Sequence, residues 1–379
     1  MFVPWPNTLS HIALHEMKHS KADVWVTGVG IISALGTGAD ENWAGLSSGI
    51  SPLRPISMPE SVHDGKFISG MVALSNDEIC HLTDLCVSEK HNRSTLMAIY
   101  SAAQALKSAE LEIPANQITS INATTVGGIS MTEKFFDALT TGEIKAGEGF
   151  VNEMDCGSLS RNVSRILGLH RPHFLISTAC SSSSNAIMLG ARLIRSGKAE
   201  MVLAGGSDSL SRFVLNGFHA LKNLDPNPCA PFDRDRFGLN LGEGAAYLLL
   251  ESRQHAEARG KSPLAAITGY ANICETYHIT GSSPDGAGAF QAMSMALNFA
   301  KMDAEEIDFI HAHGTSTIDN DLAESSAIKR LLGEGAAFGS SKVYTGHTLA
   351  ASGAVSAVLS IGMMKQKFVF PTLNFKNPI

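Results

Sequence analysis

Runs of apolar residues alternate with amphipathic segments along most of the chain. The apolar runs predict buried strands at 24–30, 124–129, 173–176, 201–206, 245–251 and 264–270, with shorter strands at 307–311 and 343–344. Segments with a 3.6-residue apolar period predict helices at 93–111, 187–194, 287–300, 321–332 and 349–364, and a short helix that begins at 42–46. Strands that are apolar on both faces and alternate with helices indicate an α/β protein whose sheets are covered on both sides.

The alternation of strands and helices starts again near residue 264, although no residue-level repeat accompanies it. With 379 residues, 44% of them hydrophobic and 17% charged, the chain is long enough to bury a large core. We therefore expect two related β/α halves, 23–255 and 256–379. A poorly structured leader at 1–22 is expected to precede them, and it lacks the apolar core of a signal peptide.

Charge and cysteine usage narrow the class of protein. A net charge of −7 argues mildly against binding to nucleic acid. The six cysteines are scattered without a Cys-x-x-Cys pair, which argues against a zinc site or a disulfide framework and favours a reducing compartment, the cytoplasm. No apolar run is long enough to span a membrane, because serine and glycine interrupt the longest one, 349–364.

Cys180 is the residue best placed for chemistry. It lies between the strand at 173–176 and the helix at 187–194, close to the helix N-terminus. Free N–H groups and the positive end of the helix dipole stabilise a thiolate there, and the small neighbours Ala179 and Ser181 leave the sulfur accessible. A buried, unreactive thiol is the simpler alternative for a single cysteine.

Two histidine motifs favour the reactive interpretation. His313 begins His-Gly-Thr-Ser-Thr after the strand at 307–311, and His347 lies in Gly-His-Thr before the helix at 349–364. Ligand sites in α/β proteins form at such strand ends. One histidine beside glycine is more often structural, whereas two of them with a cysteine at a similar turn indicate acyl chemistry. Residues 27–30 (Thr-Gly-Val-Gly) lack the third glycine of a dinucleotide-binding turn.

Together these motifs resemble the elongating β-ketoacyl-acyl carrier protein synthases of the thiolase-like superfamily. The resemblance runs from about Val24 to the end of the chain, and the matching segments are 178–182, 233–238, 242–245, 313–317 and 346–353. It implies a five-layer αβαβα fold built from two duplicated halves, with the nucleophile at 23–255 and the histidines at 256–379. Relatives continue beyond the position of Ile379, so we expect the C-terminal half to be incomplete and to lack a glycine-rich loop that completes the oxyanion hole.

The resemblance also implies an activity. Cys180 accepts an acyl group from a pantetheine thioester, and His313 and His347 stabilise the enolate left when malonyl-acyl carrier protein loses CO₂. The acyl group and the enolate then condense, in fatty acid, polyene or polyketide synthesis. The expected partners are acyl carrier protein and a second ketosynthase subunit, in a homodimer or a heterodimer. No metal or redox cofactor is expected, since the substrates are carried on phosphopantetheine.

Further residues match positions of the family, and each has a structural alternative. Lys342 and Glu324 are expected to orient His347, or else form an ordinary buried ion pair. Thr315 and Thr317 match hydroxyls that bind pantetheine, and helix capping is their alternative. Phe218 matches an aromatic residue of the acyl channel, or else it is a core residue. His278 matches a position at the pantetheine entrance, or else it is structural, and Lys222 matches a basic residue that meets the acidic carrier protein, or else it is simply solvated.

Two other functions remain open at this point. A non-catalytic partner subunit, similar to a chain-length factor, would measure the acyl chain inside a heterodimer, but such proteins usually lack the nucleophile. A coenzyme A-dependent thiolase or acyltransferase would pair the cysteine with one histidine and a second cysteine. The retained Cys180 and the His-Gly-Thr-Ser-Thr loop favour the decarboxylating condensing enzyme over both.

Overall fold

The fold is described from a computed structural model, which covers residues 24–83, 85, 87, 91–115, 117–142, 151–278 and 281–379. The predicted leader at 1–22 lies outside these residues. The strands are β1 (Val24–Ile32), β2 (Arg54–Pro55), β3 (Ile68–Gly70), β4 (Thr119–Ala123), β5 (His173–Ile176), β6 (Met201–Asp208), β7 (Leu241–Gly242), β8 (Gly244–Ser252), β9 (Ala265–Ile267), β10 (Ile310–His311) and β11 (Phe338–Gly339).

The helices match the predicted periodic segments and add several short ones. They are α1 (Ala39–Ser47), α2 (Asn76–Leu82), α3 (Arg93–Ser108), α4 (Ile129–Thr141), α5 (Val151–Met154), α6 (Gly157–Ile166), α7 (Ser182–Arg195), α8 (Arg212–Ala220), α9 (Arg253–Ala258), α10 (Ala287–Ala300), α11 (Ile318–Leu332), α12 (Lys342–Thr345) and α13 (Ser352–Gln366), with 3₁₀ turns η2 (Ala304–Glu306) and η3 (Leu349–Ala351). In the part of the chain that the structure describes, no helix has both the length and the apolarity to cross a bilayer.

The largest sheet has the strand order β5-β4-β6-β8-β1-β9. Its β5, β4 and β6 run parallel, whereas β8 is antiparallel to both β6 and β1, and β9 is antiparallel to β1. Every residue of β1 and β6 is buried, as expected for strands covered on both faces. The strand β5 forms one edge of the sheet and directly precedes the turn of Cys180.

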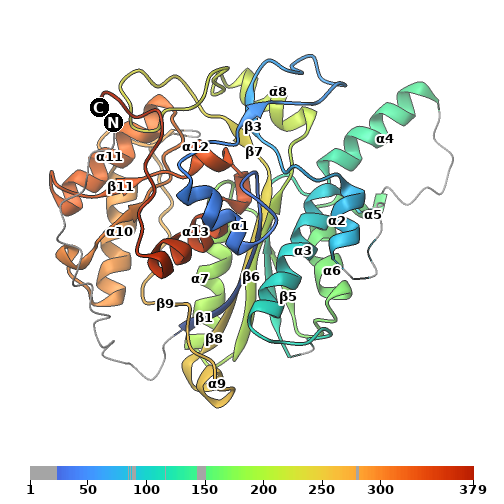
Figure 1. Ribbon diagram of the computed structural model, residues 1–379, viewed down its shortest axis with the longest axis horizontal. Coiled ribbons are helices and arrows are strands. Elements are labelled where there is room, and N and C mark those ends of the chain that lie inside the picture. Colours follow the sequence, from blue (N-terminus) through green and yellow to red (C-terminus); the bar gives the residue numbers. More distant parts are fainter. Residues whose placement is uncertain are drawn as a thin grey trace.

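Helices and strands form five layers in Figure 1. The helices α3 and α6 cover one face of the large sheet, and α7 and α13 cover the other. Beyond α7 and α13 lies the short strand β11, which pairs in parallel with β10, and then come α10 and α11. The predicted α/β architecture with an αβαβα layer order is therefore present, although the second sheet contains just β10 and β11 among the described residues.

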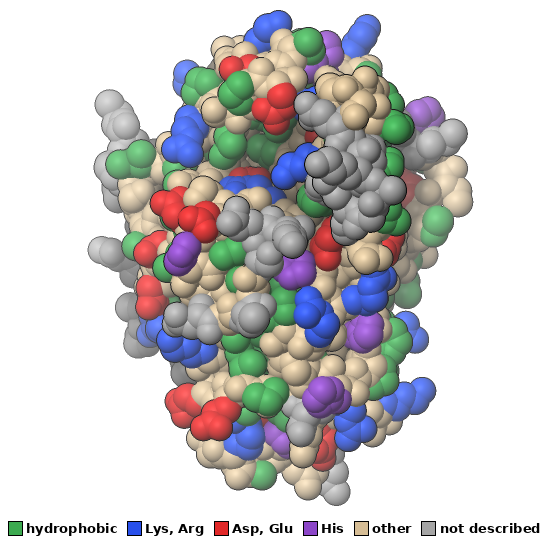
Figure 2. All heavy atoms as spheres, turned by 90° about the vertical axis from the view of Figure 1, so that its right-hand side faces the viewer, with side chains coloured by type: hydrophobic (Ala, Val, Ile, Leu, Met, Phe, Trp, Pro, Cys, Tyr) green, Lys and Arg blue, Asp and Glu red, His purple; other side chains and the backbone are tan. Residues whose placement is uncertain are grey.

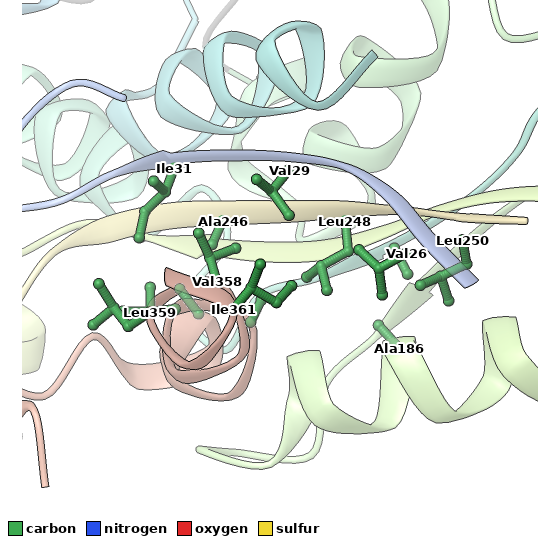
Figure 3. Packing of buried hydrophobic residues seen from close by; sticks show 14 of the residues in the cluster. Val26, Val29, Ile31, Ala186, Ala246, Leu248, Leu250, Val358, Leu359 and Ile361 are labelled. Atoms are coloured by element: carbon green, nitrogen blue, oxygen red, sulfur yellow. The ribbon is translucent and has the colours of Figure 1, made fainter. Parts of the chain in front are cut away.

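The main core fills the space between the large sheet and the helices α7 and α13. Figure 3 shows side chains of β1 and β8 pointing toward these helices, and the labelled residues are Val26, Val29, Ile31, Ala186, Ala246, Leu248, Leu250, Val358, Leu359 and Ile361. On the opposite face the backbone of α3 lies almost against β1. A Cβ atom added to Gly28 would be 2.2 Å from the carbonyl oxygen of Ala105. This glycine therefore serves close packing inside β1, which continues to Ile32 instead of turning at Gly30.

Two predicted strands are wrong. Residues 343–344 belong to the short helix α12, where Tyr344 is buried and donates from its hydroxyl to the carbonyl oxygen of Pro371. Residues 124–129 are not a strand either: the strand β4 lies just before them and ends at Ala123. The hydroxyl of Thr124 bonds to Asp208, and the chain turns at Gly127, whose φ is +50°.

One face of the molecule carries exposed apolar groups among charged ones. Figure 2 shows the side that lies on the right in Figure 1, where hydrophobic side chains are interspersed with acidic and basic ones. Among the exposed hydrophobic residues are Phe136 and Leu139 of α4, Phe213 of α8 and Phe174 of the edge strand β5. An exposed apolar group on an edge strand, such as Phe174 on β5, is typical of a protein interface.

Candidate active site

Cys180 lies in a tight turn between β5 and α7, two residues before the helix begins. The residue before it, Ala179, has a φ of +53°, a left-handed conformation that is unfavourable for alanine. Ser182 holds this turn from two sides: its hydroxyl accepts the N–H of Thr178 at 2.8 Å and donates to the carbonyl oxygen of Ala179 at 2.6 Å. The prediction that Cys180 lies at a strand-to-helix turn is therefore confirmed.

The serines that follow Cys180 join two helices at their N-termini. The hydroxyl of Ser183 accepts the N–H of Ala354, in the first turn of α13, at 3.0 Å. Next to it, Ser184 lies so close to Gly353 that a Cβ atom on this glycine would be 2.1 Å from the serine hydroxyl. These contacts bring the start of α7 against the start of α13, and with it the turn of Cys180 close to the loop of His347.

Both histidines reach the same space as the cysteine. His313 follows β10, and His347 follows α12, so each lies in a loop after a secondary-structure element of the C-terminal half. The sulfur of Cys180 and one ring nitrogen from each histidine all lie within 4.8 Å of one another. His347 is buried, whereas Cys180 and His313 are partly accessible. The structure therefore brings together the three side chains that the sequence predicts for acyl chemistry.

Hydrogen bonds fix which ring nitrogen carries the proton in each histidine. The Nδ1 atom of His347 accepts the backbone N–H of Leu349 at 3.0 Å, and Nδ1 of His313 lies 3.3 Å from the amino group of Lys342, which has only donors to offer. Each Nδ1 is an acceptor, so each proton resides on Nε2. Cys180 therefore lies beside two imidazoles, each of which keeps an Nε2–H group as a donor.

Both imidazoles are neutral at physiological pH. Burial and the positive charge of Lys342 hold the pKa of His313 and of His347 well below the ordinary value of 6.5. Burial also raises the pKa of the Cys180 thiol, and the charge of Lys342 and the residue's own backbone N–H oppose this rise without cancelling it. The sequence predicts a thiolate stabilised by the helix N-terminus, and burial of Cys180 acts against that stabilisation.

The same trio has the residue types of a metal site, but its hydrogen bonds do not suit one. A thiolate and two imidazoles within 4.8 Å of one another are ordinary ligands of a divalent metal ion. A ligating nitrogen must offer a lone pair, however, and the Nε2 atoms of His313 and His347 carry protons because their Nδ1 atoms face donors. The arrangement is suited to holding a developing negative charge.

Lys342 and Glu324 both act on His313. The amino group of Lys342 contacts Nδ1 of His313 and donates to its carbonyl oxygen at 2.6 Å. The carboxylate of Glu324 accepts the N–H groups of His313 and Gly314, at 2.6 and 2.7 Å. The sequence predicts that this pair orients His347, and the observed hydrogen bonds correct that prediction to His313.

The remaining predicted residues lie in the loop of His313, on α8 and just after α8. The hydroxyls of Thr315 and Thr317 bond to each other at 2.8 Å, and Thr317 makes no capping bond to α11, so helix capping does not explain its hydroxyl. The ring of Phe218 lies 6.5 Å from that of His347 and packs on a hydrophobic cluster that includes Leu349. Lys222 is exposed just after α8.

His278 is exposed in the loop between β9 and α10. Its place at a pantetheine entrance stays a prediction, as do the substrate-binding roles of Thr315, Thr317 and Phe218 and the carrier-protein role of Lys222.

The segment 233–238 supports the loop of His313 from outside. The guanidinium of Arg236 donates to the carbonyl oxygens of Thr317 and Ile318, at 3.3 and 2.6 Å. Asp321, which is buried, accepts the N–H of Ser316 in this loop and the N–H of Phe232. This segment therefore braces the histidine loop instead of contacting the reacting groups.

One residue at the site was missed by the sequence interpretation. Asp208, at the end of β6, is fully buried, and its carboxylate accepts N–H groups from the turn after β4 and from η3. Burial raises its pKa to about 6, against the effect of these hydrogen bonds. The signal available in the sequence was a single aspartate that ends an otherwise uncharged strand, 201–208.

Comparison with known proteins gives the same family for both halves. The model described as "Beta-ketoacyl synthase, N-terminal domain" matches residues 21–256, and "Beta-ketoacyl synthase, C-terminal domain" matches residues 264–376. A 3-oxoacyl-(acyl-carrier-protein) synthase 2 of Synechocystis sp. is 32% identical over 372 residues, which cover 94% of this chain and 89% of the relative.

Solved structures agree with this. The ishigamide ketosynthase/chain length factor superposes with a TM-score of 0.88 at 30% identity, and a type II polyketide synthase acyl-carrier protein in complex with its ketosynthase gives 0.85 at 29% identity. Each match covers 95% of this chain and 90% of the solved one. With both family models matched in order and the cysteine and two histidines brought together, the chain belongs to the β-ketoacyl synthase family.

Proposed function

We propose that this protein is a β-ketoacyl-acyl carrier protein synthase, which condenses an acyl group held on Cys180 with malonyl-acyl carrier protein. One observation carries the proposal: the sulfur of Cys180 lies within 4.8 Å of nitrogens of two imidazoles whose outward N–H groups are fixed as donors. A nucleophile beside two neutral N–H donors is suited to acyl transfer followed by stabilisation of an enolate.

In the first step the sulfur of Cys180 attacks the carbonyl carbon of an acyl thioester. The bond from that carbon to the pantetheine sulfur breaks, the bond to the cysteine sulfur forms, and the thiol proton ends on the departing pantetheine sulfur. The backbone N–H of Cys180 is suited to donate to the oxygen of the tetrahedral intermediate. The carrier protein then leaves as a free thiol.

In the second step malonyl-acyl carrier protein loses CO₂. The electron pair of the broken carbon–carbon bond moves toward the thioester carbonyl, whose oxygen becomes negative. The Nε2–H groups of His313 and His347 donate to this oxygen, and because both rings are neutral they stabilise the enolate without first protonating it.

In the third step the enolate carbon attacks the thioester carbonyl on Cys180. A carbon–carbon bond forms, and the bond to the cysteine sulfur breaks with its electron pair on the sulfur. This thiolate takes up a proton from water, and the product is β-ketoacyl-acyl carrier protein. No electron is transferred to or from an outside group in any of the steps. The proposed reaction therefore needs no redox cofactor, and the two histidines supply the electrophilic assistance that a metal supplies in other enzymes.

The proposed partners are acyl carrier protein and a second ketosynthase subunit. The solved relative that contains an acyl-carrier protein bound to its ketosynthase supports the first. Among the described residues β5 forms an edge of the large sheet. This edge and the exposed Phe136 and Leu139 of α4 support the second, because a partner chain would cover them. Cys156, Cys180, Cys229 and Cys274 form no disulfide, and we place the protein in the reducing cytoplasm.

A chain-length-factor role is the second candidate. The solved ketosynthase/chain length factor is a structural neighbour, so the fold allows either function. Cys180 together with its two histidines favours catalysis, because a subunit that measures chain length needs no nucleophile. A thiolase would place a second cysteine beside the first, and the cluster around Cys180 contains none among the described residues.

The test is to incubate the protein with an acyl-carrier protein that bears a medium-length acyl chain and with malonyl-acyl carrier protein, and to follow both by mass spectrometry. We expect an acyl adduct on the peptide of Cys180 and then β-ketoacyl-acyl carrier protein. Cys180→Ala should abolish both, whereas the matched control Cys274→Ala, at an exposed cysteine, should keep both. Product formation by the Cys180→Ala variant would refute the assigned nucleophile.

A further inference from the structure

The buried carboxylate of Asp208 lies between the two loops that carry reacting groups. It ends β6 and accepts hydrogen bonds from Thr124, Thr125 and Val126 on one side and from Ala350 on the other. Among the residues that the structure describes, no cation lies within ion-pair distance of it. Burying a carboxylate without a cation costs free energy unless hydrogen bonds compensate it. Hydrogen bonds to a charged acceptor are strong, so those of Asp208 hold the surrounding backbone firmly.

One side of this network leads to Cys180. The carboxylate accepts the hydroxyl of Thr124 at 2.5 Å and the N–H of Thr125 at 3.1 Å, which fixes the turn after β4. From that turn the hydroxyl of Thr125 donates to the carbonyl oxygen of Ala179 at 3.2 Å. This carbonyl belongs to the peptide that links the strained Ala179 to Cys180.

The other side leads to His347. The second carboxylate oxygen accepts the N–H of Ala350 at 2.9 Å. The peptide that it holds follows Leu349, whose φ of +50° is unfavourable for leucine. The N–H of Leu349 is in turn the donor that fixes Nδ1 of His347 as an acceptor. Two hydrogen bonds, from the adjacent N–H groups of Ala350 and Leu349, therefore connect the carboxylate of Asp208 to the ring of His347.

We infer that Asp208 is a positioning residue that holds the turn of Cys180 and the loop of His347 in their mutual arrangement. The inference deepens the proposed function and rests on it. Two non-glycine residues in left-handed conformations, Ala179 and Leu349, flank the reacting groups, and such strain persists only where the surroundings impose it. Asp208 is the side chain that bonds to the peptide after Leu349 and, through Thr125, reaches the peptide after Ala179.

The charge of Asp208 provides a signature that a merely structural residue would lack. Its negative charge opposes formation of a thiolate at Cys180 and so contributes to the raised pKa of that thiol. An asparagine in its place would be nearly identical in shape, but the NH₂ group would face donors where the carboxylate offers acceptors. Asp208→Asn therefore removes the charge and at least one backbone hydrogen bond together.

The experiment compares Asp208→Asn with a matched control, Glu251→Gln. Glu251 is also a fully buried carboxylate of the same sheet, but it pairs with Met201 at the far end of β6, whereas Asp208 pairs with Gly244. Two readouts are taken on the full chain: the pH profile of Cys180 alkylation by iodoacetamide, and CO₂ release from malonyl-acyl carrier protein.

Asp208→Asn should lower the apparent pKa of alkylation and slow CO₂ release by about 10- to 100-fold, the scale of a small misplacement of a catalytic group. Glu251→Gln should leave both as in the unmodified protein, even where it lowers the melting temperature. An Asp208→Asn variant with the unmodified profile and rate would overturn the inference.

If Asp208→Asn does not fold, Thr125→Val tests the positioning role of Asp208 instead. It removes only the hydroxyl that bonds to Ala179, and it should slow acylation of Cys180 more than CO₂ release. Equal acylation rates for this variant and the unmodified protein would count against the positioning network. If the unmodified protein releases no CO₂, the proposed function fails, and the alkylation profile of Asp208→Asn still tests the role of Asp208.

Discussion

The rings of His313 and His347 lie 5.2 Å apart between centroids and are almost perpendicular, at 89°. Their Nδ1 atoms are both occupied as acceptors, so two N–H groups on differently oriented rings border one space. An oxygen placed there receives hydrogen bonds along different directions, which suits the lone pairs of an enolate oxygen. In the proposed reaction these groups have separate roles: the sulfur of Cys180 binds the acyl chain, and the histidines stabilise the negative charge of the enolate.

The first prediction concerns the donor on His347. His347→Ala should lower the rate of CO₂ release from malonyl-acyl carrier protein by about 10²-fold, the scale for loss of one oxyanion donor. His347→Gln should retain more activity than His347→Ala, because the glutamine amide places an N–H near the position of Nε2. Equal rates for the two variants would show that this N–H is not what matters.

The second prediction concerns Lys342 and pH. Its charge contributes to the lowered pKa of both histidines, so Lys342→Met should raise both values. A histidine whose pKa rises becomes protonated at higher pH, and the acid limb of the pH–rate profile for CO₂ release should therefore move to higher pH. Lys329→Met, at an exposed lysine of α11 that pairs with Glu334, is the control and should not move it. An unshifted limb in Lys342→Met would contradict the assignment.

The third prediction concerns His311, which is structural. Its two nitrogens bond to Ser360 and Ser341, both at 2.9 Å, and burial lowers its pKa to about 3. A histidine with a lowered folded-state pKa stabilises the protein above the unfolded value of 6.5 and loses this contribution as pH falls.

Between pH 7 and pH 5 this residue should therefore cost about 2 kcal/mol of unfolding free energy. In urea unfolding at the two values, His311→Gln should lose less stability on acidification than the unmodified protein does. Identical losses would mean that His311 is accessible to protons in the folded state.

The fourth prediction concerns the close packing of β1 and α3. A Cβ atom at Gly30 would lie 2.0 Å from the carbonyl oxygen of Ser101, so Gly30→Ala should destabilise the fold by about 3 kcal/mol or more. Gly217→Ala is the control, because no atom lies within 4 Å of the added Cβ and the residue is helical. It should be neutral or stabilise by about 0.5–1 kcal/mol. Similar melting temperatures for both variants would contradict the packing.

Much of the fold could be predicted because the strongest signals are local. Long runs such as 201–206 and 245–250 have no charged residue to bring to a surface, so they mark buried strands before any tertiary contact is known. Cys180, His313 and His347 were found because each lies beside small or glycine residues at the end of an element. Their convergence required the motifs to be considered together.

What the sequence missed depends on tertiary contacts. Residues 343–344 are too short to distinguish strand from helix, and only burial under residues 370–371 shows why they coil as α12. The family resemblance predicts His347 as the target of Lys342, whereas folding brings the amino group of this lysine to His313. Asp208 carries no motif, since its partners lie more than eighty residues before it and more than one hundred after it.

The most direct test of the central claim separates the half-reactions. The protein, Cys180→Ala, and the double variant Cys180→Ala with His347→Ala are each given malonyl-acyl carrier protein labelled with ¹³C in the free carboxylate, and release of ¹³CO₂ is measured. We predict that Cys180→Ala still releases ¹³CO₂ while the double variant falls by about 10²-fold. Equal release by the two variants, or complete loss in Cys180→Ala alone, would contradict the assignment of the sulfur to acyl transfer and the imidazoles to decarboxylation.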